Sequence, residues 1–246
     1  MSVSEAAERQ PADARAPMEV AVVIPVIDEE RALSHVLRAL AAAHRGPVYV
    51  VDGGSTDGTV AVAREHGAMV LVESRRGYGR ACDSGARAAI AAGARILVFL
   101  DGDFADDPAR LPRLLAPIVA DRADLVIGAR VGRLQQRGAM PAHQRAGNAL
   151  VALLLRLLYD VPVGDTGSFR AIRAAVYQDL GLREMTYGWP VEIVARAALR
   201  GYRVREVPVP YRPRIGVSKV SGTVRGSARA GYRLLRTAVR VRLGQR

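Results

Sequence analysis

The chain has 246 residues, half of them hydrophobic, which is enough to bury a substantial core and argues against a disordered protein. A single cysteine, Cys82, excludes an internal disulfide framework and is typical of a reducing compartment. The formal net charge of +12 is unevenly spread, because the segment from Arg196 to the end holds 14 arginine and lysine residues against one acid, Glu206. Such a segment predicts attraction to nucleotide phosphates, a phospholipid surface or nucleic acid.

The first eighteen residues lack the apolar core of a signal peptide, and we expect 1–18 to be a disordered leader. From there to about residue 130, short apolar runs alternate with segments of helical periodicity. Such alternation implies right-handed crossovers and a mostly parallel sheet. No apolar run reaches the length of a membrane span, so we expect no spanning helix. The predicted strands are 20–24, 48–51, 69–72, 96–100 and 125–127, and the predicted helices are 29–43, 59–66, 81–92 and 110–120.

Charged residues follow each of the first four predicted strands. They occupy the segments 28–30, 52–57, 75–80 and 101–103. All four loops should open on one edge of the sheet, where open α/β sheets bind ligands. A nucleotide there would meet acids for its base and ribose hydroxyls and arginines for its phosphates. A dinucleotide-binding Rossmann site is excluded because no G-x-G-x-x-G follows the first strand.

The segment Asp101-Gly102-Asp103 follows the most apolar of these strands. Two carboxylates at the end of a buried strand are costly without compensation, and carboxylate oxygens are good ligands for Mg²⁺ or Mn²⁺. A simple turn is the alternative interpretation, because Asp-Gly and Asp-Asp-Pro both favour turns. This segment alone leaves both interpretations open.

The order of the motifs resembles family 2 glycosyltransferases with a GT-A fold. In the first half these motifs are P-x-x-x-E-E at 25–30, V-D-G-G-S-T-D-G-T at 51–59, R-G-Y-G-R-A at 76–81 and L-D-G-D at 100–103. In the second half, the segments 128–130, 143–148, 165–170 and 212–219 resemble the dolichyl-phosphate mannose synthase-like branch. The resemblance implies an α/β fold, a mostly parallel sheet flanked by helices, over 19–222. The helical spacing of apolar residues beside arginines predicts a basic amphipathic helical tail over 223–246.

The resemblance also implies roles for individual residues. Asp52 would contact the nucleotide base, Asp103 would bind the metal directly, and Asp101 would face the sugar or ribose and complete the metal site. The branch often has glutamine where this chain has Ala105, so Asp106 is a candidate substitute ligand. The further residues implied for the nucleotide sugar are Pro25, Glu30, Arg76, Gly77, Gly102, Arg130, Arg214, Ser218 and Lys219, and those for an acceptor phosphate are Arg145 and Asn148.

The implied reaction displaces a nucleoside diphosphate from the anomeric carbon of a sugar. A divalent cation, Mg²⁺ or Mn²⁺, and arginines can stabilise the charge on the leaving diphosphate. A sugar hydroxyl acceptor needs a general base, whereas a phosphate acceptor is already anionic. Asp165 and Glu192 are the candidate bases, although a turn explains the first and a favourable helix dipole explains the second equally simply.

Two segments bear on the acceptor. The apolar run 149–158 follows Arg145, and the C-terminal segment has apolar residues at helical spacing beside a stripe of arginines. Each is explained either by packing within the domain or by contact with a lipid and an anionic membrane surface. We therefore expect an inverting transferase that moves a hexose from GDP-mannose or a UDP-sugar to a polyprenyl phosphate.

We expect such an enzyme to be cytoplasmic, with peripheral attachment to the inner face of the membrane. A soluble family 2 enzyme acting on a small-molecule acceptor is the alternative. Nucleic acid is not an expected partner, because acids follow the strands and aromatic residues for base stacking are few.

Overall fold

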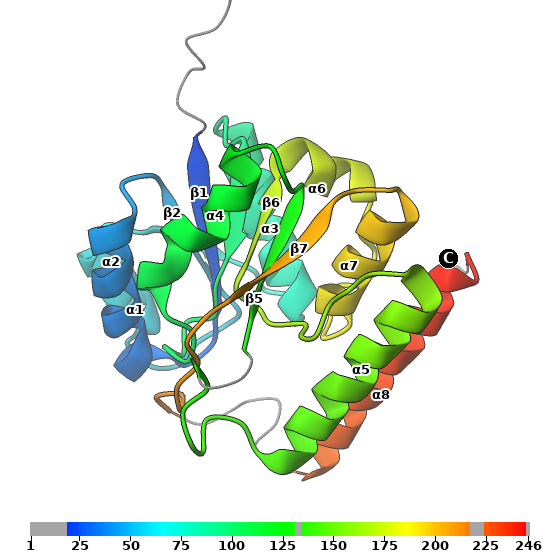
Figure 1. The fold of residues 1–246 in the computed structure, drawn as a ribbon. Helices are drawn as coiled ribbons and strands as arrows, with labels where there is room; N and C mark the ends of the chain where they lie inside the picture. Colours follow the sequence, from blue (N-terminus) through cyan, green and yellow to red (C-terminus); the bar gives the residue numbers. More distant parts are fainter. Residues whose placement is uncertain (1–18, 131–133, 217–223, 245–246) are drawn as a thin grey trace, which may run out of the picture.

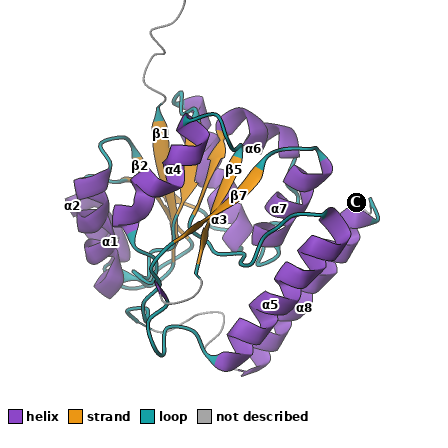
Figure 2. Ribbon diagram, viewed as in Figure 1, coloured by secondary structure: helices purple, strands orange, loops and turns teal. Residues whose placement is uncertain are grey.

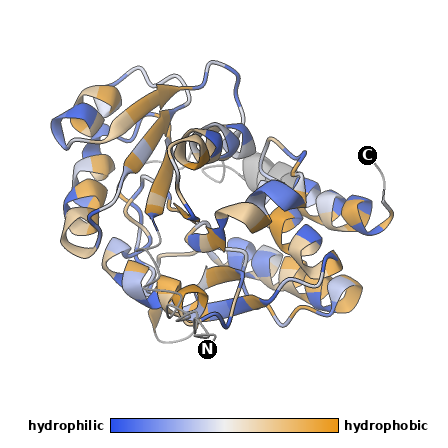
Figure 3. Cartoon of the chain, turned by 90° about the horizontal axis from the view of Figure 1, so that it is seen from above, coloured by the Kyte–Doolittle hydropathy of each residue, from blue (hydrophilic) through white to orange (hydrophobic). Residues whose placement is uncertain are grey.

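The computed structural model describes residues 19–130, 134–216 and 224–244. The predicted disordered leader therefore lies outside the described residues. A central sheet lies between two layers of helices (Figures 1 and 2). Hydrophobic residues are concentrated in the strands, while the helices carry both hydrophobic and hydrophilic residues (Figure 3). None of the helices in the described ranges combines the length and apolarity that a bilayer span requires.

The sheet has seven strands in the order β3-β2-β1-β4-β6-β5-β7. Strands β1, β2, β3 and β4 are mutually parallel, as are β5 and β7, whereas β6 is antiparallel to both β4 and β5. The bounds are β1 Val20–Val26, β2 Val48–Asp52, β3 Met69–Val72, β4 Ile96–Phe99, β5 Leu125–Ala129, β6 Arg170–Arg173 and β7 Val204–Pro208. The predicted mostly parallel sheet is confirmed.

Helices cover both faces of this sheet because its strands are apolar on both sides. On one face lie α1 (Glu30–Ala43), α2 (Thr59–Glu65) and α4 (Leu111–Val119), the last preceded by a 3₁₀ turn at Pro108–Arg110. On the other lie α3 (Tyr78–Ala91), α5 (Ala142–Tyr159), α6 (Ala174–Leu180) and α7 (Trp189–Leu199). Successive residues of β1 alternate between these two cores: Val22 and Ile24 face the first, and Val23 faces the second.

The C-terminal helix α8 (Val224–Arg242) lies alongside α5 and also contacts α7 (Figure 1). Ala238 and Val241 are buried in the second core, and the Tyr159 hydroxyl donates a hydrogen bond to the carbonyl of Ala238. The opposite side of α8 leaves Tyr232 and Leu243 exposed. The tail is thus both a packing element of the domain and a bearer of exposed apolar side chains.

Candidate active site

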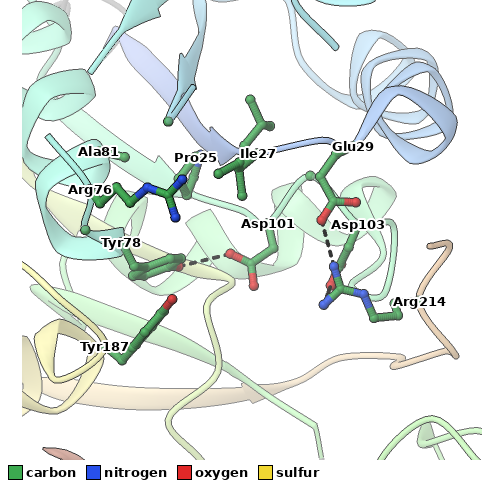
Figure 4. Close-up of a pocket in the computed structure, with 14 residues that line it drawn as sticks. Pro25, Ile27, Glu29, Arg76, Tyr78, Ala81, Asp101, Asp103, Tyr187 and Arg214 are labelled. Atoms are coloured by element: carbon green, nitrogen blue, oxygen red, sulfur yellow. Dashed lines mark hydrogen bonds and ion pairs between the residues drawn. The ribbon is translucent and has the colours of Figure 1, made fainter. Parts of the chain in front are cut away.

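A cavity of about 260 Å³ lies at the carboxyl ends of the parallel strands (Figure 4). We call it the strand-end cavity. All four predicted loops contribute to its wall, so segments far apart in sequence meet at one edge of the sheet, as expected for parallel strands. Its lining consists of Pro25, Val26, Ile27, Glu29, Gly53, Arg76, Gly77, Tyr78, Ala81, Asp101, Gly102, Asp103, Tyr187 and Arg214.

The first two loops are bound to each other by hydrogen bonds. Asp28 has a left-handed backbone, a conformation that Asp and Asn adopt more readily than most residues, and its carboxylate accepts from the N–H of Thr56 at 2.7 Å. Glu30 accepts from the N–H of Gly58 at 3.0 Å, and Asp52 accepts from the N–H of Gly54 at 3.1 Å. Neither Glu30 nor Asp52 lines the cavity; Glu29 does. The carboxylates of Glu30 and Asp52 therefore hold the backbone of these loops through hydrogen bonds.

The Asp-Gly-Asp segment forms the floor of the cavity. Gly102 is required here, because a Cβ would lie 2.7 Å from a methyl carbon of Val26. The Tyr78 hydroxyl donates to Asp101 Oδ1 at 3.0 Å, and Asp103 Oδ1 accepts from the N–H of Ala105 at 2.9 Å. Burial and the adjacent Asp101 carboxylate raise the pKa of Asp103.

Two arginines bring positive charge to the cavity. Arg214 lies 2.7 Å from Glu29 Oε1 and 3.4 Å from Asp103 Oδ2, so it joins the first loop to the aspartate segment. Arg76 is exposed and makes no hydrogen bond or ion pair with another described residue, which leaves its guanidinium available to a ligand. An arginine that is already paired and one that is unpaired thus flank the same hollow.

The lining includes tyrosines that the sequence interpretation did not select. Tyr78 lies between two glycines in the R-G-Y-G-R-A motif, and that motif was the sequence feature that could have identified it as a cavity residue. Tyr187 comes from the loop between α6 and α7, which pairs with the start of α3 through the N–H of Gly79, donating to the carbonyl of Thr186 at 3.3 Å. No sequence pattern indicates that pairing.

Asp165, a candidate base, lies in a buried ion pair outside the cavity lining. Arg130 binds it with two guanidinium contacts of 2.6 and 2.7 Å, and Asn148 donates to it at 3.4 Å. Although burial acts to raise the pKa of Asp165, the charge and hydrogen bonds of Arg130 outweigh it and lower that pKa. The predicted residues Arg130, Asn148 and Asp165 are therefore brought together, as a cluster distinct from the strand-end cavity.

Glu192, the other candidate base, is fully buried at the start of α7. It accepts hydrogen bonds from the N–H groups of Arg183 and Glu184 at 2.9 and 2.6 Å, and Arg196 lies 2.7 Å away. It does not line the strand-end cavity. These contacts give Glu192 a structural role, holding the loop that carries Tyr187.

Asp106, the candidate substitute ligand, is buried beside the floor of the cavity without lining it. Its Oδ2 accepts from Ser168 at 3.2 Å, while its Oδ1 has no hydrogen-bond partner. Burial raises the pKa of Asp106 to about 8, and the nearby carboxylates of Asp101 and Asp103 add to the rise. Burial thus favours the protonated form of this carboxyl.

The remaining predicted residues lie away from the cavity or beyond what the structure describes. Arg145 is exposed on the first turn of α5 and does not line the cavity. Ser218 and Lys219 lie outside the described residues. Within the described part of the chain, no three histidine, cysteine or acidic side chains form a group able to hold a metal ion by themselves.

The fold and this site define a GT-A transferase that uses nucleotide sugars. The model of the family described as glycosyl transferase family 2 matches residues 21–181. The chain therefore belongs to glycosyltransferase family 2.

Three relatives agree with this assignment. An uncharacterised glycosyltransferase of Mycobacterium tuberculosis is 41% identical over 211 residues, covering 85% of this chain and 92% of the relative. A dolichyl-phosphate hexose transferase of Haloferax volcanii is 35% identical, with 85% and 90% covered. An undecaprenyl-phosphate mannosyltransferase of Micrococcus luteus is 32% identical, with 86% and 91% covered. The relatives support the predicted dolichyl-phosphate mannose synthase-like branch.

A solved structure confirms the GT-A fold. Glucosyl-3-phosphoglycerate synthase of Mycobacterium tuberculosis, in complex with Mn²⁺, uridine diphosphate and phosphoglyceric acid, superimposes with a TM-score of 0.74 at 20% identity. The match covers 94% of this chain and 80% of that one.

Proposed function

We propose that this enzyme transfers a hexose, with inversion, from GDP-mannose or a UDP-sugar to a polyprenyl phosphate. The observation that carries the proposal is the strand-end cavity, in which Asp101 and Asp103 face Arg76 and Arg214. Two relatives in the same family are named for dolichyl-phosphate and undecaprenyl-phosphate acceptors. Family 2 enzymes use nucleotide sugars as donors, and an assay with different nucleotide sugars identifies the base and the sugar.

A divalent cation fits the carboxylates of the cavity floor. Burial, and then the nearby carboxylate of Asp101, raises the pKa of Asp103, and a cation at this place would stabilise the charged form of both carboxyls. Magnesium commonly uses one or two protein carboxylates and completes its shell with substrate phosphates and water, so a protein-only cluster is not required. We assign Asp101 and Asp103 to Mg²⁺ or Mn²⁺, and the Mn²⁺ complex of the structural neighbour supports a metal of this class.

The arginines act on the diphosphate of the donor. A divalent cation bound to Asp101 and Asp103 would stabilise the negative charge that develops on the leaving diphosphate. Arg214 reaches the same region from the segment after β7, and the unpaired guanidinium of Arg76 offers bidentate hydrogen bonds to phosphate oxygens. Both side chains therefore favour the transition state electrostatically.

A phosphate acceptor agrees with the placement of the candidate bases. Asp165 is held by Arg130 and Glu192 by Arg196 and two backbone N–H groups, so neither has an oxygen directed into the strand-end cavity. A hydroxyl acceptor requires proton removal, whereas a phosphate monoester at neutral pH is already a nucleophilic anion. This difference favours the polyprenyl phosphate over a sugar hydroxyl.

The transfer assay compares two acceptors of equal chain length. The full chain is incubated with nucleotide sugars and Mg²⁺ or Mn²⁺, with a short-chain polyprenyl phosphate or with the matching polyprenol. We expect metal-dependent product from the phosphate alone. Equal transfer to the polyprenol would contradict the phosphate acceptor, and transfer only to water-soluble acceptors would favour the small-molecule alternative.

Peripheral membrane contact is the second part of the proposal. Leu150, Leu153 and Leu157 of α5 are 47%, 51% and 72% exposed and lie on one side of the helix, and α8 packs against α5. Exposed apolar side chains on helices that also carry exposed arginines, here Arg145 of α5 and Arg236 of α8, are typical of helices that lie on anionic membranes. Removing α8 would uncover the core face of α5, so a point substitution is the sharper test.

We expect Leu153→Asp to reduce co-sedimentation with vesicles that contain phosphatidylglycerol. Val72→Asp is the matched control, because Val72 is 70% exposed on the edge strand β3, in another part of the molecule. Equal vesicle binding by both variants and the unmodified protein would show that α5 does not contact the membrane.

A further inference from the structure

A second cavity, of about 440 Å³, lies between α8 and the loop that precedes α7. We call it the arginine cavity. Its charged lining consists of Arg233, Arg236, Arg240 and Glu184, and Thr186, Tyr232 and Thr237 complete it. None of these residues lines the strand-end cavity.

The three arginines face one hollow because of their spacing along α8. Residues three, four and seven apart lie on the same side of a helix, and like charges there repel one another. A single carboxylate, Glu184, faces them, and its nearest contact to Arg240 is 3.5 Å. The lining of this partly open hollow therefore carries an excess of positive charge.

The guanidinium groups are only partly engaged. Arg233 donates to the Thr186 hydroxyl at 2.8 Å, and Thr186 in turn donates to Glu184 through its N–H and its hydroxyl. Arg236 is exposed and makes no hydrogen bond or ion pair with another described residue. Donors thus remain for a ligand that brings negative charge and several acceptor oxygens.

The walls of this cavity hold one another closely. A Cβ on Gly188 would lie 2.4 Å from the Thr237 hydroxyl oxygen of α8, so the loop and the helix are in direct contact at that point. Glu192 holds the start of the same loop through the N–H groups of Arg183 and Glu184. The hollow is therefore bounded by packed elements on both sides.

We propose that the arginine cavity binds a phosphate group. Several guanidinium groups converging on one hollow match the charge and the multiple acceptor oxygens of phosphate. The volume exceeds that of a water molecule, roughly 30 Å³, many times over, so a phosphate fits with its hydrating waters. A free phosphate monoester and a phospholipid headgroup present the same chemistry.

The arginine cavity lies next to the strand-end cavity. Thr186 lines the arginine cavity, and the following residue, Tyr187, lines the strand-end cavity. One short loop thus forms part of both walls. A phosphate bound in the arginine cavity would contact the same loop that borders the strand-end cavity, where the proposed function places the nucleotide sugar.

The experiment measures phosphate binding to the full chain at constant ionic strength, by calorimetry, with EDTA present. Arg236→Gln and Arg233→Gln are compared with Arg242→Gln, which is exposed on the same helix and does not line the cavity. A parallel series with Mg²⁺ in place of EDTA and with saturating UDP or GDP separates any phosphate bound in the strand-end cavity. The second arm replaces inorganic phosphate by vesicles of phosphatidylcholine with and without phosphatidylglycerol.

We expect each cavity variant to weaken binding about tenfold, and Arg242→Gln to leave it unchanged. An effect on inorganic phosphate identifies a free phosphate site, and an effect confined to phosphatidylglycerol vesicles identifies a headgroup site. An equal effect of all three substitutions, or none on either probe, would overturn the proposal. Because Arg236 is exposed and unpaired, Arg236→Glu serves as a second variant that leaves the packing intact. The result does not depend on the transfer assay, so the two proposals fail separately.

Discussion

The two cavities of this molecule hold charge in opposite ways. In the strand-end cavity, Arg214 pairs with Glu29 and Asp103, so acids and arginines are interleaved. In the arginine cavity, three guanidiniums from one helix face one acid. A site of mixed sign suits a cation together with a diphosphate, whereas a site of one sign suits an anion alone.

The two cavities also differ in what positions their side chains. Loops at strand ends, bound by backbone hydrogen bonds, fix the aspartates of the first. The second depends on long side chains that project from a helix surface, and their rotamers are less restricted. Substitutions in the first should therefore have the larger effects.

The largest effect should come from Asp103→Asn. Loss of its charge removes the proposed metal ligand, and we expect turnover to fall about 1,000-fold, as when a main electrostatic contact to a transition state is removed. Steady-state rates with a nucleotide sugar and Mn²⁺ measure it. Asp179→Asn is the matched control, since Asp179 pairs with Arg200 on the surface. Unchanged turnover in Asp103→Asn would contradict the assignment of the metal to the Asp101-Gly102-Asp103 segment.

Glu192→Ala tests whether the loop between the cavities is held structurally. Two backbone N–H groups and Arg196 would lose their buried partner, and we expect the free energy of unfolding to fall by about 4 kcal/mol. The pH dependence of kcat should stay the same, because this carboxylate does not face the donor. Loss of the acidic limb of the pH profile, with unchanged stability, would instead identify a general base.

Asp106→Asn tests what it costs to ionise the carboxyl buried beside the floor of the strand-end cavity. The folded pKa of about 8 lies above the unfolded value, so this group contributes stability at low pH that is lost as pH rises from about 4 to about 8. Asparagine cannot ionise, and we expect the variant to gain about 4 kcal/mol over the unmodified protein near pH 7 and little near pH 4. Urea unfolding with EDTA measures this difference, and parallel pH profiles would contradict it.

The sequence predicts the strand-end cavity better than the arginine cavity for a topological reason. Apolar runs mark the parallel strands, and the ends of parallel strands meet whatever the details of packing. Residue choice within those loops is harder. The sequence motif points to Glu30 as the nucleotide-binding acid, whereas Glu29 lines the cavity. At the start of a helix, neighbouring side chains point in different directions, so a shift of one position decides which acid faces the cavity.

Strand β6 is not predicted from the sequence, because its residues contradict the usual burial pattern. Strand β6 is Arg-Ala-Ile-Arg, yet Arg170 is fully buried, with its guanidinium donating to the carbonyls of Thr166 and Pro190 at 3.0 Å. Those acceptors belong to loops whose positions depend on the tertiary fold. The apolar spacing of α8 did not decide between packing and exposure either, since Ala238 is buried and Val239 is 44% exposed.

Arg214→Gln measures how far charge pairing in the strand-end cavity supports nucleotide binding. We expect the dissociation constant of UDP or GDP with Mn²⁺ to rise about tenfold, the loss of one charge-assisted contact. Arg212→Gln is the matched control on the same segment, because Arg212 pairs with Asp107 and covers the Phe104 ring without lining the cavity. Equal effects of the two substitutions would mean that only the overall charge matters.

The smallest effect should come from Tyr159→Phe, which tests how α8, and with it the arginine cavity, is held on the domain. The hydroxyl of Tyr159 donates to the Ala238 carbonyl within the core between α5 and α8. Its removal should lower the free energy of unfolding by about 1 kcal/mol, the usual contribution of a buried hydrogen bond. Tyr202→Phe is the control, because its hydroxyl binds Asp179 at the surface and should contribute less. If urea unfolding shows no loss in Tyr159→Phe while phosphate binding also persists, α8 is held by its apolar contacts alone, and the arginine cavity does not depend on this hydrogen bond.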